Sequence, residues 1–310
     1  MGEQLFYFLI YPGMLFAGVV GGLIAWVDRK VTARVQFRQG PPVLQPFYDF
    51  LKLLLVKETV LPKHGSAIFF LLAPVLGLFG ATASALLILL PAFGITEGFR
   101  GDIIVLFYLL AIPSLMFVIG AMASGNPLSA VGASREIKLI LSYELTFILV
   151  VAGVILKSGQ TLYLDEIMMM QQTQGAFIGS ISGVLLFVAA LFTIQGKAGL
   201  VPFDLAEAET EIAEGTFMEY SGTAYAIIKY TKYILLFILP VFVAEIFFGG
   251  LTFTGIHILW SILKVVLVLV LMILIRNTNP RVKISQAMRF FLLWMNLLVI
   301  AGLVLHYLGL

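Results

Sequence analysis

The most informative stretch of the sequence runs from Lys197 to Thr223 and reads KAGLVPFDLAEAETEIAEGTFMEYSGT. The chain is 61% hydrophobic and has 17 acidic residues, and this stretch holds six of them: Asp204, Glu207, Glu209, Glu211, Glu214 and Glu219. Long apolar segments precede and follow it. Ionisable groups are costly inside membrane proteins and mark ion or proton pathways there. The stretch therefore predicts an acidic loop between two membrane helices that handles protons or cations.

Working outward from this loop, apolar runs dominate the chain, and its mean hydropathy is +1.05. Runs of about 18 residues or more are long enough to cross a bilayer as helices. They predict an all-α integral membrane protein in which residues 1–310 form one polytopic domain. The expected transmembrane helices number about eight, over residues 5–27, 68–92, 103–123, 138–156, 177–195, 221–248, 255–275 and 288–308.

The distribution of basic residues predicts the orientation. The loops after the first, third, fifth and seventh expected spans carry fourteen Lys and Arg residues, whereas the opposite side carries only Arg100 and Lys157. Because cytoplasmic loops carry the excess of Lys and Arg, we expect these four loops in the cytoplasm and both termini outside, in a multi-pass protein of the cell membrane. The cytoplasmic loops include residues 28–63 and the acidic loop, residues 196–222.

Several classes of function are excluded by what the sequence lacks. It has no cysteine, which excludes thiolate-bound iron–sulfur clusters in this chain. The three histidines, His64, His257 and His306, fall in unrelated segments without metal-ligand spacing. The net charge of +2 gives no electrostatic footprint for nucleic acid. We therefore expect no metal and no cofactor in this chain, so that any redox centre lies on a partner.

The loop at residues 28–63 contains an amphipathic helix. Apolar residues recur there at helical spacing, namely Leu44, Phe47, Tyr48, Leu51, Leu54 and Leu55, with Gln45, Asp49 and Lys52 on the other side. One interpretation is an interfacial helix that only anchors the loop. The other is a docking surface for a soluble partner, formed with Arg34 and Arg38, which lie one helical turn apart. Basic loop residues are often topology signals alone, so these arginines do not separate the two interpretations.

Two carboxylates fall inside expected spans. Glu144 lies one turn into the fourth span, and Glu245 lies deep in the sixth, close to its outer end. A charge in the bilayer usually faces the protein interior with a partner or a proton. Glu144 is thus either a relay carboxylate or half of a structural ion pair, with Lys229 or Lys232 as the candidate partner. Glu245 is the weaker candidate, since its position also allows it to reach the interface.

The acidic loop is expected to be helical. Pro202 favours a helix start, and Asp204, Glu207, Glu211 and Glu214 then lie on one helical face, with Glu209 elsewhere. Like charges one turn apart raise one another's pKa and titrate as a coupled set, as a proton relay requires. The alternative is a solvated acidic helix without function. Glycines in and beside the loop, such as Gly199 and Gly215, would permit a hinge that changes conformation with protonation.

At these residues the chain resembles a known family, the membrane subunit of respiratory complex I that carries the quinone tunnel, with its relatives in membrane-bound [NiFe] hydrogenases of group 4. Four ordered blocks carry the resemblance: ARVQFRQGP at 33–41; QPFYDFLK at 45–52 with Lys57-Glu58; ASRE at 133–136 with SYEL at 142–145; and PFDLAEAE at 202–209 through EYSG at 219–222. The pattern of eight spans agrees along the whole chain.

The resemblance implies a role at the junction between a peripheral electron-transfer arm and ion-translocating membrane subunits. In this family the acidic loop and buried glutamates begin a charged axis through the membrane arm. The matching ion-coupling positions here are Glu136, Glu144, Asp204, Glu207, Glu209, Glu211, Glu214 and Glu219. The positions matching the docking face for the arm are Arg34, Arg38 and Lys52, to which we add Asp49. The implied partners are hydrogenase-like and iron–sulfur subunits of the peripheral arm, antiporter-like membrane subunits and the lipid bilayer. The subunits of the arm would carry iron–sulfur clusters and, in one branch of the family, a nickel–iron centre.

One departure from the family separates its branches. Quinone-reducing members have a longer, Gly-rich segment in the first loop, whereas Gly40-Pro41-Pro42-Val43-Leu44-Gln45 is compact here. The short form resembles the hydrogenase branch and related archaeal sulfane or polysulfide reductase complexes, and it argues against quinone binding. We therefore expect a coupling subunit, with no catalytic centre of its own, of a ferredoxin-linked oxidoreductase. The alternatives are a quinone-reducing complex I-type subunit and, less favoured, a stand-alone secondary transporter.

Overall fold

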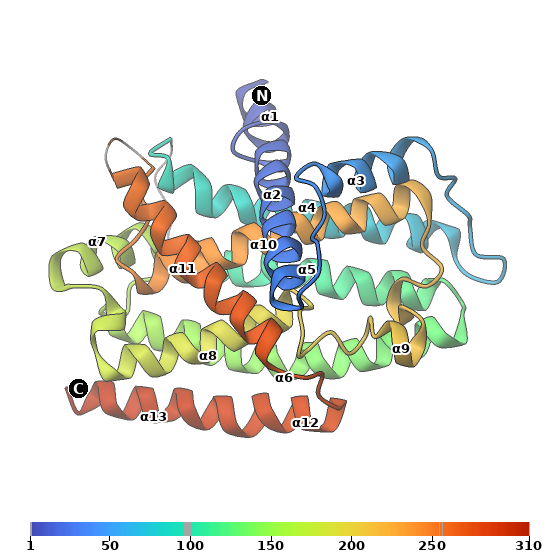
Figure 1. Ribbon diagram of the computed structural model, residues 1–310. Helices are drawn as coiled ribbons and strands as arrows, with labels where there is room; N and C mark the ends of the chain where they lie inside the picture. Colours follow the sequence, from blue (N-terminus) through green and yellow to red (C-terminus); the bar gives the residue numbers. More distant parts are fainter. Residues whose placement is uncertain (1, 96–100, 254, 256, 310) are drawn as a thin grey trace.

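A computed structural model describes residues 2–95, 101–253, 255 and 257–309. Over these residues it contains helices and no strand, which confirms the all-α membrane class. In Figure 1 most of the long helices run side by side across the view, and α2 and α11 cross them obliquely. The acidic loop lies at one end of this bundle, and α7 and the C-terminus lie at the other.

The long helices follow the expected order. They are α2 Met14–Val35 (preceded by α1, Gly2–Leu9), α4 Ala67–Ala92, α5 Asp102–Ala123, α6 Pro127–Lys157, α8 Ile181–Lys197, α10 Gly222–Phe247, α11 His257–Thr278 and a last helix built from α12 Ile284–Arg289, η3 Phe290–Met295 and α13 Asn296–Tyr307. Seven of these segments are long and apolar enough to cross a membrane, and α8 is a shorter apolar helix of 17 residues.

The helix α6 is longer than expected. It has 31 residues, which correspond to about 46 Å at 1.5 Å per residue, against a hydrocarbon thickness of about 30 Å. Asn126 caps its start, since the Asn126 side chain accepts a hydrogen bond from the backbone N–H of Leu128 at 2.8 Å. The sequence predicted that this span begins at residue 138, but the eleven residues before it are helical as well. Arg135 and Glu136 therefore lie on the same helix as Glu144.

Helix α10 is the centre of the fold. It packs against α2, α4, α3, α11 and α8, and most of its side chains are buried. Close approach of α2 depends on small residues, as is common between membrane helices. A Cβ atom at Gly21 would lie 1.9 Å from the carbonyl oxygen of Tyr233 on α10, and one at Gly18 would lie 2.1 Å from the Tyr230 ring.

The amphipathic helix of the first loop is present as α3, Gln45–Leu55. The sequence predicted that the first loop begins at residue 28, but α2 extends to Val35. The connection between α2 and α3 is therefore shorter than the loop predicted over residues 28–63. The Trp26 ring N–H donates to the carbonyl oxygen of Pro41 at 3.1 Å, which holds the Gly40–Pro42 turn against α2. The helix α3 rests on α2 and α10.

A helix that the sequence did not predict, α7 (Leu164–Gln174), lies between α6 and α8. It has only 11 residues and a polar composition, so it was not recognisable as a span. Gln171 attaches it to the end of α10. The Gln171 amide accepts from the backbone N–H of Gly249 at 3.0 Å and donates to the carbonyl oxygen of Glu245 at 3.3 Å.

The acidic loop is not the continuous helix that the charge spacing predicted. Only α9, Glu209–Ile212, and the short 3₁₀ helix η2, Gly215–Phe217, are helical, and residues 199–208 form turns. Left-handed φ values at Ala213, Glu214 and Gly215 end α9 after Ile212. Buried apolar side chains, with Phe203 and Leu205 among them, fold the loop back onto the bundle. Consequently Asp204, Glu207, Glu211 and Glu214 do not share one helical face.

The close contact at Gly21 gives a first prediction. Gly21→Ala places a methyl group against backbone that cannot rotate away, so we expect a loss of about 1–3 kcal/mol in the free energy of unfolding. Unfolding in a graded denaturing detergent measures it. Gly179→Ala is the matched control, because no heavy atom lies within 4 Å of its added Cβ. Equal stability of the two variants would contradict the assigned packing.

The predicted orientation can be tested because the chain has no cysteine of its own. We expect a single cysteine introduced as Lys283→Cys to react with a membrane-impermeant maleimide only after the cytoplasmic side is opened. Glu166→Cys, on α7, should react in intact cells. The reverse labelling pattern would show that the protein has the opposite orientation.

Candidate functional site

A buried ion pair between α6 and α8 is the centre of the candidate site. The ammonium of Lys197 donates to the Glu144 carboxylate, and the two side chains are 2% and 13% exposed. Aromatic rings surround the ammonium, with ring centroids at 4.6 Å for Phe147, 5.5 Å for Tyr143 and 5.8 Å for Phe107. Charges at this depth persist only when they are paired, and the rings add cation–π stabilisation.

The second oxygen of Glu144 is buried and has no hydrogen-bond partner within the described part of the chain. The Tyr143 hydroxyl beside it donates to the Ser114 hydroxyl at 3.2 Å. Most buried polar groups have a hydrogen-bond partner, so this oxygen is an exception. Glu144 is thus paired with Lys197 through one carboxylate oxygen only.

Glu136 connects this pair with the acidic loop. It lies eight residues before Glu144 on α6, a rise of about 12 Å, and the i, i+4, i+8 spacing puts both on one face. Glu207 and Lys232 lie close enough to act on the charge of Glu136, and both Glu136 and Glu144 act on Tyr143. The charged groups therefore form a line from the loop into the bundle.

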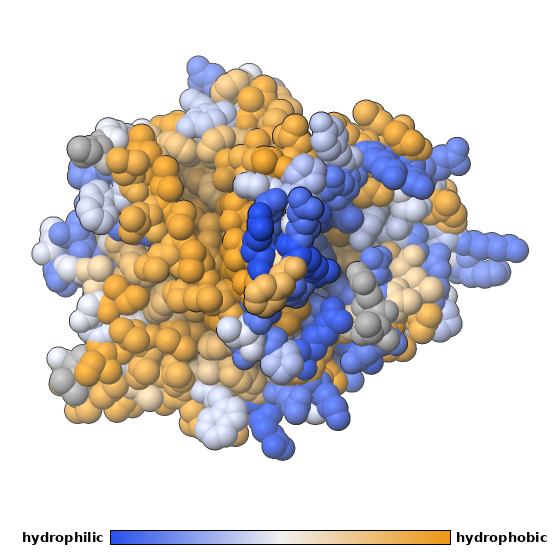
Figure 2. Space-filling model, in the orientation of Figure 1, coloured by the Kyte–Doolittle hydropathy of each residue, from blue (hydrophilic) through white to orange (hydrophobic). Residues whose placement is uncertain are grey.

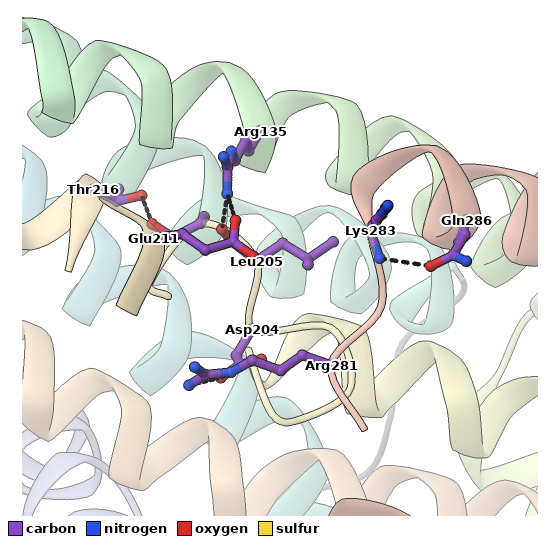
Figure 3. Close-up of polar contacts among 9 residues, drawn as sticks. Arg135, Asp204, Leu205, Glu211, Thr216, Arg281, Lys283 and Gln286 are labelled. Carbon is purple, nitrogen blue, oxygen red and sulfur yellow. Dashed lines mark hydrogen bonds and ion pairs between the residues drawn. The ribbon is translucent and has the colours of Figure 1, made fainter. Parts of the chain in front are cut away.

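Within the loop, each carboxylate with a described ion pair has a partner on a different element. Asp204 lies 2.7 Å from the Arg281 guanidinium, and Glu211 lies 2.6 Å from that of Arg135 (Figure 3). Glu207 pairs with Lys232, an ion pair that joins the loop to α10. These contacts replace the expected single acidic face with a network that joins the loop to α6, α10 and the α11–α12 connection.

The remaining acidic positions of the loop differ from one another. Glu219, at its end, accepts from the Asn126 side chain. Glu214 is half-buried and acts on the charge of Lys229. The side chain of Glu209 lies outside the described residues. Tyr220, next to Glu219, stacks on the Phe70 ring at 4.1 Å and donates to the carbonyl oxygen of Phe70 at 3.0 Å. Its burial raises the pKa of Tyr220, so this hydroxyl remains a neutral anchor.

The expected partners of Glu144 are corrected by this geometry. Lys232 pairs with Glu207, and the Lys229 ammonium lies 4.8 Å from the Tyr225 ring centroid. The partner of Glu144 is Lys197, which the sequence presents at a span end, where a lysine is usually interpreted as a topology signal. One feature of the sequence could have indicated this partner: a single lysine directly follows an apolar segment and precedes the acidic stretch.

A second ion pair was missed for the same reason. Asp28 on α2 pairs with Arg276 on α11, and the Asp28 side chain is 8% exposed. Both lie at the ends of expected spans, where charges are ordinary. Glu245, for which the sequence left open a position at the interface, is fully buried, and neither carboxylate oxygen has a hydrogen-bond partner among the described residues.

The first loop presents an exposed basic surface. Arg34, Arg38 and Lys52 are exposed, and Figure 2 shows hydrophilic residues gathered over the end of α2. Between the two arginines, Phe37 is 100% exposed with a left-handed φ of 56°. That conformation is rare for an aromatic residue. Asp49 instead faces its own chain, since it pairs with Arg29 at 3.1 Å and accepts from Gln45 at 2.8 Å.

The candidate site consists of ion pairs and single carboxylates. Over the described residues, no group of three or more His, Cys, Asp or Glu side chains could hold a metal ion. The line from the loop to Glu144 contains the Glu207–Lys232 pair, then Glu136, and then the Glu144–Lys197 pair. By Coulomb's law, a change of charge at one of these groups changes the electrostatic potential at the groups beside it.

Comparison with known proteins identifies the family of this chain. The family model described as NADH dehydrogenase matches residues 8–307. An NADH-quinone oxidoreductase subunit from Thermomicrobium roseum is 34% identical, over 96% of this chain and 94% of its own length. The corresponding protein from Anoxybacillus flavithermus is 35% identical, over 92% and 88%.

A solved structure is similar along nearly the whole chain. It is a chain from the membrane-bound sulfane sulfur reductase, an archaeal respiratory membrane complex, with a TM-score of 0.87 and 28% identity over 98% of this chain and 99% of that one. The chain thus belongs to the NADH dehydrogenase family, as a multi-pass membrane protein similar to these subunits of NADH-quinone oxidoreductase.

Proposed function

We propose that this chain is the coupling subunit of a ferredoxin-linked respiratory oxidoreductase, either a membrane-bound hydrogenase or a sulfur or polysulfide reductase. It would join a peripheral electron-transfer arm to proton or sodium translocation and would itself bind no redox centre. The observation that carries the proposal is the line of charged groups from the loop pairs, through Glu136, to the buried Glu144–Lys197 pair.

The proposed mechanism is electrostatic. Electron transfer in the docked arm changes the charge or proton count next to the acidic loop. The Glu207–Lys232 pair and Glu136 respond, and the change reaches Glu144, whose second oxygen accepts a proton while Lys197 holds the other. In a low-dielectric interior a unit charge acts over many ångströms with little screening. Antiporter-like membrane subunits would receive the signal.

The similarity to the sulfane sulfur reductase chain supports this branch, as does the compact Gly40–Gln45 segment. One observation favours the quinone-type alternative. A cavity of 370 Å³ between α2, α3, α4 and α10 is walled by apolar side chains such as Leu78, Phe50 and Tyr230. Several relatives are named as subunits of NADH-quinone oxidoreductase.

The first experiment is to purify the native complex in mild detergent, identify every chain that co-purifies, and measure nickel and iron. Nickel with iron supports the hydrogenase branch. Iron without nickel leaves the sulfur reductase and the quinone reductase, which turnover with polysulfide and with a short-chain quinone then separates. A chain that purifies alone and metal-free, while other respiratory complexes remain intact, would refute a coupling subunit.

The buried pair gives a prediction on coupling. We expect Glu144→Gln to abolish ion translocation while electron transfer to the acceptor continues, because the relay carboxylate is lost. Ion uptake by proteoliposomes and substrate turnover measure the two separately. Since removal of one partner of a buried ion pair costs about 3–5 kcal/mol, Glu144→Gln combined with Lys197→Met serves as the stable, charge-free version.

The exposed carboxylate variant Glu166→Gln, on α7, is the control and should translocate ions normally. If the double variant assembles and still translocates ions, Glu144 and Lys197 are not part of the relay.

The basic surface gives a prediction on assembly. Phe37→Ala and Arg38→Ala should each lower the yield of peripheral subunits that co-purify with this chain, because an exposed aromatic ring and an arginine are typical anchors of protein interfaces. In Phe37→Ala the contacts that remain at this surface are ionic, and salt screens them. The loss of co-purifying subunits should therefore increase with salt concentration in that variant. Lys63→Ala, an exposed residue away from this surface, is the control. Unchanged yield at every salt concentration would rule out docking there.

A further inference from the structure

A groove lies where α8, α12 and the α11–α12 connection meet, beside the acidic loop but outside the line of charged groups. Its volume is 640 Å³, within the range of about 300–1,000 Å³ that is usual for ligand sites. The wall is aromatic. Phe192 and Phe203 flank Phe290, with ring centroids 5.0 and 5.7 Å away, and Trp294 completes the wall with 59% of its surface exposed.

The backbone of the last helix contributes to this shape. Residues Phe290–Met295 form a π-helical turn, η3, between α12 and α13. Such turns insert an extra residue into a helix and occur frequently at functional sites. Both Phe290 and Trp294 belong to this turn and line the groove.

Positive charge gathers at the rim of the groove. Arg281 and Arg289 line it, and Lys283 lies between them in the chain. Arg281 is bound to Asp204, as Figure 3 shows. Arg289 is exposed, and over the described residues it has no ion-pair partner. The rim thus has a guanidinium available to an anion next to an apolar wall.

The position of the groove places that rim at the membrane surface. Residues 279–282, which follow α11, and Arg289 of α12 line the rim, so we expect it at the boundary between water and hydrocarbon on whichever side the loop faces. Phospholipid phosphates occupy this level, and tryptophan is enriched there. Basic pockets between membrane helices bind anionic lipid headgroups.

We propose that this groove is a binding site for an anionic phospholipid. The phosphate contacts the guanidinium groups of Arg289 and Arg281, and the start of an acyl chain lies against Phe290 and Trp294. Because Arg281 also binds Asp204, a bound lipid touches the same guanidinium that holds the acidic loop. A lipid phosphate is favoured over other anions because the rim is positively charged and lies at the expected level of the lipid headgroups.

The test uses the full chain reconstituted in vesicles of phosphatidylcholine that contain a minor fraction of phosphatidylglycerol, with bromine on the acyl chains of one lipid at a time. Bromine quenches tryptophan fluorescence on contact. We expect brominated phosphatidylglycerol to quench about fivefold more per molecule than brominated phosphatidylcholine. Trp294→Phe should remove this difference, although Trp26 and Trp260 remain.

Arg289→Gln should abolish the preference, Arg289→Lys should retain part of it, and Lys63→Gln, which removes an exposed charge elsewhere, should leave it unchanged. Equal quenching by the two lipids, or a preference that survives in Arg289→Gln, would overturn the proposal. Shielding of Trp294 from both lipids in the intact complex would also overturn the proposal, because a neighbouring subunit would then cover the groove.

Discussion

The buried ammonium of Lys197 is the constraint on which the rest of the site depends. A lysine that is 2% exposed between membrane helices needs a counter-charge, and Glu144 supplies it from the neighbouring helix. The pair fixes the register of α6 against α8, and the rings of Phe147, Tyr143 and Phe107 close around it. Because Glu144 and Glu136 share one rigid helix, fixing this register also fixes where Glu136 meets the acidic loop.

The acidic loop is held by ion pairs rather than by its own secondary structure. It has only a four-residue helix and one 3₁₀ turn, and ion pairs to Arg135, Arg281 and Lys232 join it to the bundle together with its buried apolar side chains. Each of these cations comes from a different part of the chain. A change in the charge of these carboxylates would therefore act directly on the contacts that anchor the loop. This property suits the coupling role proposed for it.

The two surfaces beside this network serve different proposed contacts. The end of α2 exposes Phe37 between two arginines and faces away from the bundle, as a surface for a soluble arm would. The groove at η3 opens at the level of the helix ends, with an aromatic wall and the exposed guanidinium of Arg289 at its rim. The acidic loop lies between the α6 pairs and this groove, so that Arg281 touches both regions.

The sequence by itself determined the fold class, the order of the membrane helices, the amphipathic α3 and the family. Apolar runs and amphipathic spacing are local properties that persist in the folded chain, and four ordered motifs identify relatives without any coordinates. It also placed Glu136, Glu144 and the loop carboxylates among the candidates, because acids are rare in a chain of this composition.

Only the tertiary structure decided which charges meet. Lys197 and Glu144 are far apart in the chain, as are Asp28 and Arg276, and nothing in the spacing of either pair predicts contact. The prediction that Asp204 to Glu214 share one helical face was wrong. This segment consists mostly of turns, and its apolar side chains are buried against the bundle. Local periodicity cannot reveal this, since the burial of Phe203 and Leu205 depends on helices contributed by distant parts of the chain.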